Sequence, residues 1–297
     1  MGAQLRVVRR RIRSVQSTKK ITRAMELIAS SRIVKAQQRV VAARPYAIQL
    51  TAAMEDLARN AGALSHPLLE ERENPTKAGV FVCTSDRGLA GAYSANVIKI
   101  AERTMAKVRE RGLEPVLYVS GKKGAGYFRF RGATIREDWQ GHTEVPPYEV
   151  ARAIGTRLIE DFAAGEFDEL YCAYTDFRSA FTLRATVKRF LPISPEEVRG
   201  AGADTVPPEY LFEPEPERIL DHLLPEYLIT KVYAALLESA ASENAARRRA
   251  MKAATDNADE LMKILTRQAN RARQDEITTE IMEIVGGAEA LSGAAKE

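Results

Sequence analysis

Two glycine-bearing loops have the composition that most suggests chemistry. They read Ser85-Asp86-Arg87-Gly88-Leu89-Ala90-Gly91 and Gly121-Lys122-Lys123-Gly124-Ala125-Gly126. Each follows a predicted strand and precedes a predicted helix, where backbone N–H groups can hold a phosphate. Neither loop has the Walker spacing, and neither is a GxGxxG sequence. Tight strand-to-helix turns are the simpler interpretation, and a nucleotide-dependent enzyme built on this segment stays as an alternative.

The histidines and cysteines do not form a catalytic or metal-binding pattern. His66, His142 and His222 lie in different segments, without a carboxylate or cysteine at metal-ligand spacing. Cys83 and Cys172 lie in separate apolar stretches and form no CxxC pair, which is typical of buried, reduced thiols. We therefore expect no catalytic residue, no cofactor and no metal in this chain.

Charge is distributed unevenly between the two ends of the chain. Residues 1–60 contain 13 Lys or Arg and 3 Asp or Glu, a net of +10, whereas residues 215–297 contain 11 and 15, a net of −4. The basic arm and the run Arg247-Arg248-Arg249 could contact phosphates, so a basic coiled-coil nucleic-acid-binding protein is an alternative. Apart from Tyr46, aromatic residues that could stack on bases are missing from both regions, which favours an internal acidic partner.

These residues need elements to position them, and the two ends of the chain predict long helices. From Leu5 to about Leu64, apolar or small residues recur three and four apart, and the stripe keeps its register across Pro45, which predicts a bend and not a stop. A helix of this length spans on the order of 80 Å and needs a second helix to pack against. A similar stripe runs from Ile219 to Ala272, so we expect an antiparallel pair.

The middle of the chain predicts an α/β domain. Short apolar runs at 79–86, 115–120 and 169–177 are typical of strands, and 181–190 could add a strand in a hairpin with the last of these. Segments 92–111, 122–130 and 147–163 have helical spacing or composition. The expected fold class is α/β with long helical extensions: an antiparallel coiled coil of the N- and C-terminal helices plus a small Rossmann-like α/β domain. The expected domains are 1–64, 75–208 and 209–297.

The bulk composition suits a folded, soluble protein, with 45% hydrophobic and 28% charged residues. The arginines near the start are not followed by an apolar segment, which argues against a signal peptide. No apolar run approaches the roughly 18 residues that span a bilayer, so we expect a peripheral component if the protein works at a membrane.

Four stretches resemble the γ subunit of F-type ATP synthases. They are Ile21 to Ala29 (ITRAMELIA), Ser85 to Tyr93 (SDRGLAGAY), Ser242-Glu243 with Arg247 and the run Ala250 to Ala258 (AMKAATDNA), and Ile277 to Ala290 (ITTEIMEIVGGAEA). The last is the most specific. The chain departs from the family pattern at Ser94, where Asn is usual, and at Leu183, where Gln is usual.

The resemblance implies a non-catalytic rotor shaft that couples proton-driven rotation of a membrane ring to ATP synthesis or hydrolysis in catalytic β subunits. Its implied partners are the α and β subunits of the catalytic ring, the ε subunit and the membrane c ring, with one copy of the chain per complex. It implies no nucleic acid, no direct membrane insertion, and a peripheral location on the cytoplasmic face of the plasma membrane.

The resemblance also assigns residues. Contacts to the catalytic ring are implied at Met25, Arg247, Arg273, Gln274, Thr278 and Glu280, a tip bearing at Gly286, Gly287 and Ala288, and foot contacts to ε and the c ring at Tyr210 and Glu213. Met25 is implied to lie where coupling is sensitive to an added charge. We further expect the arginines of the last helix to keep hydrogen-bond donors free for a partner, because no local acid satisfies all of them.

Overall fold

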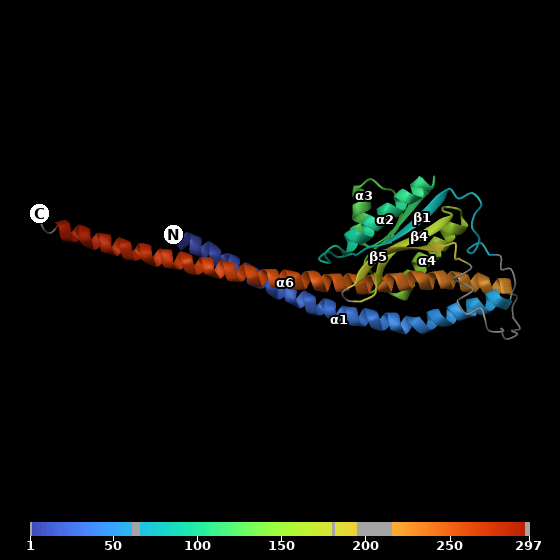
Figure 1. Cartoon of the computed structure of the whole chain (residues 1–297), viewed down its shortest axis with the longest axis horizontal. Coiled ribbons are helices and arrows are strands. Elements are labelled where there is room, and N and C mark those ends of the chain that lie inside the picture. Colours follow the sequence, from blue (N-terminus) through green and yellow to red (C-terminus); the bar gives the residue numbers. More distant parts are fainter. Residues whose placement is uncertain (1, 61–65, 180–181, 195–215, 295–297) are drawn as a thin grey trace. The chain divides into compact units, whose positions relative to one another are not determined.

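The computed structural model describes residues 2–60, 66–179, 182–194 and 216–294. The chain divides into two compact units: residues 1–28 with 248–297, and residues 29–247. Two long helices, α1 (Gly2–Asn60) and α6 (Pro216–Ala294), contribute to both units (Figure 1). Neither Pro45 in α1 nor Pro225 in α6 ends its helix, which confirms the prediction that Pro45 is not a stop.

The second unit contains a five-stranded sheet of order β3-β2-β1-β4-β5. Its strands are β1 (Lys77–Cys83), β2 (Glu114–Ser120), β3 (Ile135–Trp139), β4 (Glu169–Phe177) and β5 (Leu183–Leu191). Strands β1 to β4 run parallel to one another, and β5 pairs antiparallel with β4, which confirms the predicted hairpin. Strand β3 was not predicted from the sequence, because its residues IREDW are largely polar and half-exposed at the sheet edge.

Alternating side chains of the strands build two cores. Val80 and Val82 of β1 face α2 (Tyr93–Glu110) and α3 (Lys122–Phe130), whose buried residues complete one apolar cluster. Phe81 and Cys83 point to the opposite face, into the cluster that also contains residues of α4 (Tyr148–Ala163). The period of two in a strand produces this division, because successive side chains lie on opposite faces. The predicted α/β domain is thereby confirmed.

The long helices cover the same face of the sheet as α4, the face to which Phe81 and Cys83 point. Met54 and Leu57 of α1 and Leu220, Leu224 and Leu228 of α6 belong to the same cluster as Phe81. As residue numbers rise along α1, their partners on α6 fall, so the helices run antiparallel in this unit, as predicted. Among the described residues, no helix is long and apolar enough to cross a membrane.

Gly155 sets the approach of α4 to α6. An added Cβ at this position would lie 2.6 Å from Ile229 Cγ1 and 3.2 Å from Ile229 Cα. No side chain larger than hydrogen fits between the two helices without moving one of them. The close contact joins α6 directly to the sheet domain.

Asp168 joins the segment before β1 to the start of β4. Its carboxylate accepts hydrogen bonds from Arg72 Nη1 at 2.8 Å, Thr76 N at 2.6 Å and Lys77 N at 2.9 Å. Burial by itself raises the pKa of Asp168, but the backbone N–H groups and the guanidinium outweigh burial and hold the pKa below its ordinary value.

Replacing Asp168 by asparagine is expected to lower the free energy of unfolding by about 2 kcal/mol at pH 7, because an ionised acceptor is lost. A lowered folded pKa contributes stability above the unfolded value, near pH 4, and this contribution is lost as pH falls through the folded pKa. The difference between wild type and variant should therefore shrink in acid. Urea titrations at pH 7 and pH 3.5 measure it, and a difference that is constant with pH would contradict the assignment.

Candidate functional site

The two glycine-bearing loops are tied together by Asp86. Its carboxylate accepts hydrogen bonds from the backbone N–H groups of Lys122 at 3.1 Å, Gly141 at 2.8 Å and Thr143 at 3.1 Å. Burial would raise the pKa of Asp86, yet these N–H groups together lower it. The first N–H group of α3 thus already has an anionic partner within the chain. This arrangement supports the interpretation of both loops as structural turns.

Two of the histidines, His66 and His142, take part in hydrogen bonds or ion pairs within the chain. His142 Nε2 lies 3.0 Å from Ser120 Oγ, and His66 Nδ1 accepts the Leu68 N–H at 3.1 Å. His66 Nε2 also lies 3.4 Å from a carboxylate oxygen of Asp221.

Arg247 lies at the centre of a buried ionic cluster. Its side chain is only 6% exposed, and Nη2 lies 2.6 Å from Glu243 Oε1, one turn earlier in α6. Nη1 lies 3.2 Å from Glu144 Oε1, in the loop after β3, and Nη2 donates to Gly88 O at 3.4 Å. Burial raises the pKa of Glu243, and the guanidinium of Arg247 offsets this only in part. The expectation that Arg247 keeps its donors free is wrong, because Glu243 and Glu144 occupy them.

Glu144 extends this cluster to α1. Its second oxygen pairs with Arg32 of α1 and lies 3.5 Å from Arg87 Nη1. One carboxylate therefore contacts both long helices and the first glycine-bearing loop. Sequence reasoning missed Glu144, since a single acid in a polar loop gives no periodic signal that distinguishes it from a solvated residue.

The first unit is an antiparallel pair formed by the start of α1 and the end of α6. Thr22 Oγ1 lies 2.7 Å from Thr255 Oγ1, and Lys19 Nζ lies 2.5 Å from Asp259 Oδ1. Both threonines are buried, whereas the ion pair is half-exposed. Part of the basic arm is thus matched by acids of the same chain, as the charge distribution suggested.

Replacing Thr22 by valine is expected to weaken this contact modestly, because Thr255 keeps its hydrogen bond to Met251 O at 2.9 Å. The free energy of local opening should fall by about 1 kcal/mol. This fall would be seen as a roughly fivefold faster exchange of the amide hydrogens around Thr22. Replacing both threonines by valine should restore slow exchange, since an apolar pair leaves no unsatisfied hydroxyl. Equal exchange in the single variant and wild type would show that the contact does not hold the helices together.

The residues implied as ring contacts occupy different surroundings. Met25 of α1 is half-buried, whereas Arg273, Gln274, Thr278 and Glu280 of α6 are exposed. Among these, Thr278 Oγ1 donates to the backbone oxygen of Gln274 at 2.9 Å. Tyr210 and Glu213, the implied foot contacts, lie outside the described residues.

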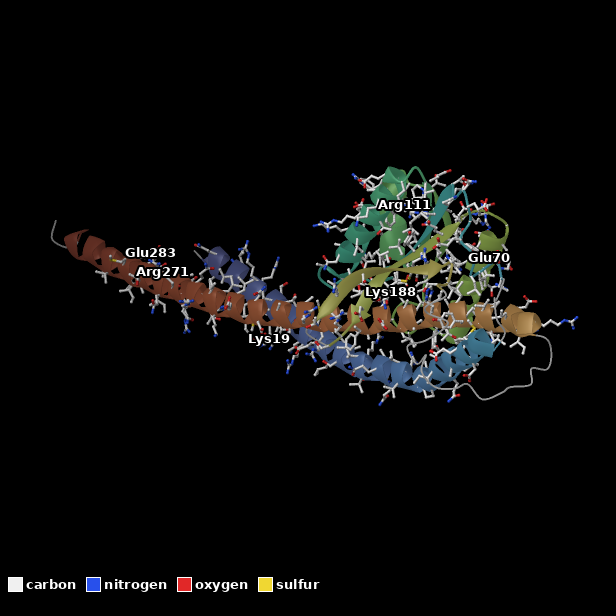
Figure 2. All side chains as sticks on the ribbon, turned by 45° about the vertical axis from the view of Figure 1, so that its right-hand side comes forward. Lys19, Glu70, Arg111, Lys188, Arg271 and Glu283 are labelled. Carbon is white, nitrogen blue, oxygen red and sulfur yellow. The ribbon has the colours of Figure 1, made fainter. Side chains whose placement is uncertain are left out.

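The end of α6 is an exposed helix. Every residue from 280 to 288 is exposed, and a Cβ added at Gly286 or Gly287 would meet nothing within 4 Å. Side chains such as Arg271 and Glu283 project away from the ribbon (Figure 2). Exposed apolar residues accompany them, and these are Ile277, Ile281, Met282, Ile284 and Val285. An exposed apolar surface of this kind indicates contact with another protein.

These features define a class: a partner-binding helical protein that carries a small α/β domain. The sequence matches the family described as ATP synthase over residues 4–291. It is 54% identical to the ATP synthase gamma chain of Thermobifida fusca, with 99% of this chain and 98% of that protein covered. It is 53% identical to the ATP synthase gamma chain of Mycolicibacterium smegmatis, with 99% and 100% covered. The chain belongs to the ATP synthase gamma-chain family.

Solved structures share the fold. A chain of the Euglena gracilis mitochondrial ATP synthase, from an assembly of OSCP, F1 and c-ring, superposes with a TM-score of 0.67 at 19% identity, covering 100% of this chain and 97% of that chain. A chain of the Tetrahymena thermophila mitochondrial ATP synthase central stalk and c-ring gives 0.58 at 22% identity, covering 79% and 99%. At these identities the likeness supports the architecture of two long helices with an α/β domain.

Proposed function

We propose that this chain is the central-stalk rotor shaft of an F-type ATP synthase. It couples proton-driven rotation of a membrane ring to ATP synthesis or hydrolysis in catalytic β subunits and is itself non-catalytic. The observation that carries the proposal is the family match along nearly the whole chain, together with relatives above 50% identity over their full length. A rotating shaft changes nucleotide affinity by presenting different faces to each β subunit, which shifts the populations of its binding states.

The partners of this function are the α and β subunits of the catalytic ring, the ε subunit and the membrane c ring, with one copy of the chain per complex. The chain is peripheral and works on the cytoplasmic face of the plasma membrane, without nucleic acid. Residues 1–64 and 209–297 form the shaft, and residues 75–208 form the foot.

The contacts with the ring fall into two kinds. Arg273, Gln274, Thr278 and Glu280 are exposed on α6 and touch the ring directly, and Met25 of α1 lies near a charge-sensitive position. Arg247 acts through the buried cluster with Glu243 and Glu144, as a positioning residue for the loop around Gly88.

Two further contacts complete the proposed shaft. The small residues Gly286, Gly287 and Ala288 form a tip bearing, because they present few long side chains to an apolar sleeve. Tyr210 and Glu213 belong to the foot that meets ε and the c ring.

The test is reconstitution of the full chain with the matching α and β subunits. We expect ATP hydrolysis that depends on this chain, in a complex containing one copy of it. A new cysteine at exposed Arg109 of α2 would take a bead selectively, since Cys83 and Cys172 are fully buried. Unidirectional rotation of the bead during hydrolysis is the expected result. Full hydrolysis by α and β without the chain, or a chain that never enters the complex, would refute the proposal.

A further inference from the structure

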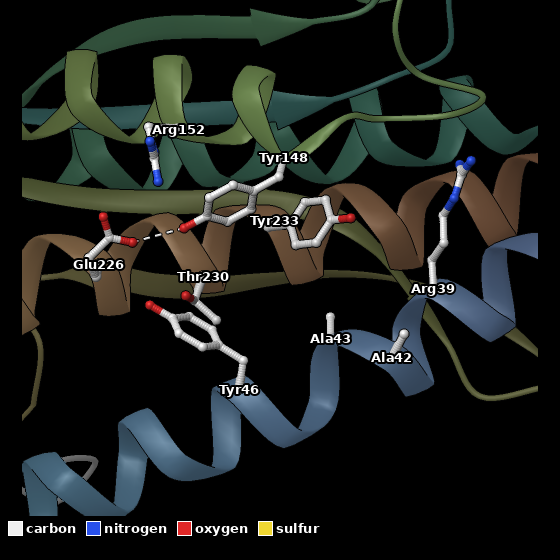
Figure 3. A pocket seen from close by; sticks show the side chains of 9 residues that line it. All are labelled: Arg39, Ala42, Ala43, Tyr46, Tyr148, Arg152, Glu226, Thr230 and Tyr233. Atoms are coloured by element: carbon white, nitrogen blue, oxygen red, sulfur yellow. Dashed lines mark hydrogen bonds between the residues drawn. The ribbon is translucent and has the colours of Figure 1, made fainter.

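A pocket of about 560 Å³ opens between α1, α4 and α6 in the second unit (Figure 3). Its volume lies in the range of small-molecule sites, which are mostly apolar with a few placed polar groups. The space exists because α1 presents the small side chains of Ala42 and Ala43 to it, between Arg39 and Tyr46. None of the residues that line it belongs to the proposed ring, tip or foot contacts.

Three tyrosines from three helices surround the pocket. Tyr46 comes from α1, Tyr148 from α4 and Tyr233 from α6 (Figure 3). The rings of Tyr148 and Tyr233 meet edge to face, with centroids 5.3 Å apart and an interplanar angle of 88°. Tyr46 is 51% exposed, so part of its ring is open to a guest. Ring faces and edges arranged in this way favour an aromatic guest.

The charged residues of the pocket favour an anion. Arg39 and Arg152 line it. Within the described part of the chain neither forms an ion pair, and the Arg152 guanidinium lies over the Tyr148 ring, 5.2 Å from its centroid. Glu226 is the only acid of the lining, and its carboxylate accepts the Tyr148 hydroxyl at 2.8 Å. Burial, with Glu226, raises the pKa of Tyr148 to about 12, so this hydroxyl stays protonated. Two guanidinium groups against one engaged carboxylate leave the lining positive, which suits a carboxylate or sulfonate.

Thr230 supplies an unsatisfied polar group. It is 8% exposed, and its hydroxyl has no hydrogen-bond partner among the described residues. The residue lines this pocket and also the smaller adjoining one of about 200 Å³. Buried hydroxyl groups in folded proteins are nearly always paired. A ligand atom that accepts or donates a hydrogen bond would satisfy this one.

We propose that this pocket binds a small aromatic anion. Its ring lies among the tyrosines, its acidic group meets Arg39, and a polar atom reaches the Thr230 hydroxyl. The site is distinct from the contacts proposed for rotation, so its existence can be tested on the full chain alone.

The probe is 8-anilino-1-naphthalenesulfonate, an aromatic sulfonate whose fluorescence rises when it is bound. Titration of the full chain is expected to saturate at one molecule per chain. Replacing Ala43 by phenylalanine fills the pocket and should weaken binding at least tenfold. The matched control is Ala53→Phe, at an exposed position of the same helix, and it should bind as wild type does.

The polar half of the site has its own tests. Thr230→Val should raise the melting temperature of the chain, because it removes an unpaired hydroxyl, and yet weaken probe binding about fivefold. Arg39→Gln, at an exposed position, should weaken binding of the sulfonate but leave binding of the neutral analogue N-phenyl-1-naphthylamine unchanged.

Several results would overturn the proposal. Equal affinity of wild type and the Ala43→Phe variant would place the probe elsewhere, and a titration without saturation would remove the site. Equal affinity for the neutral and anionic probes would refute the selectivity for an anion.

Discussion

Replacing Arg247 by methionine is expected to lower the free energy of unfolding of the second unit by about 3 kcal/mol. The substitution leaves Glu243, which is fully buried, without its cation, and it frees the Glu144 oxygen that Arg247 holds. The single tryptophan, Trp139, packs on Phe81 and Tyr118 within this unit, so its fluorescence in urea reports the unfolding directly.

The loss should depend on pH. Burial raises the folded pKa of Glu243 above its ordinary value of 4.5, so the protonated carboxyl contributes stability that is fully present below about pH 4.5 and lost as pH rises through the folded pKa. Removal of the guanidinium raises this pKa further. The deficit of the variant relative to wild type should thus be smallest in acid and grow toward neutral pH.

Two controls separate a buried cluster from a surface contact. Arg273→Met removes an exposed arginine of the same helix and should leave stability nearly unchanged while altering hydrolysis in the assembled complex. The double variant Glu243→Leu with Arg247→Met should regain much of the lost stability, because both charges leave together. Equal stability of the Arg247→Met and Arg273→Met variants would show that Arg247 has no structural role.

Replacing Gly121 by alanine is expected to lower the free energy of unfolding by at least about 3 kcal/mol. Two effects combine: a positive φ of 99°, which costs an L-residue about 1–2 kcal/mol, and an added Cβ only 2.4 Å from the backbone oxygen of Thr84. Because the clash is with backbone, no side-chain rotation relieves it. The turn between β2 and α3 would have to move away from β1.

Gly112 provides the matched control for this substitution. Its φ is 79°, but an added Cβ there meets nothing within 4 Å. Gly112→Ala should therefore cost only the backbone strain, about 1 kcal/mol. Urea unfolding of both variants, followed by Trp139 fluorescence, measures the difference. Similar losses of unfolding free energy at the two positions would mean that the close approach of Gly121 to Thr84 adds nothing to the cost of the substitution.

Much of the fold could be predicted because its signals are local. The spacing of apolar residues predicted both long helices and the continuation of α1 through Pro45, and short apolar runs predicted four of the five strands. Strand β3 escaped because an edge strand needs little apolar surface. The family resemblance of the run from Ile277 to Ala290 did not depend on any contact within the chain, which is why the exposed end of α6 could be singled out beforehand.

By itself, the sequence determined the type of most elements, the opposite charges of the two ends of the chain and the family. Tertiary structure alone decided which polar groups meet: Arg247 with Glu144 across more than a hundred residues, Thr22 with Thr255, and three tyrosines around one pocket. The physical reason is that periodicity records which face of an element is buried, whereas an ion pair or a cavity depends on the positions of single side chains from distant segments.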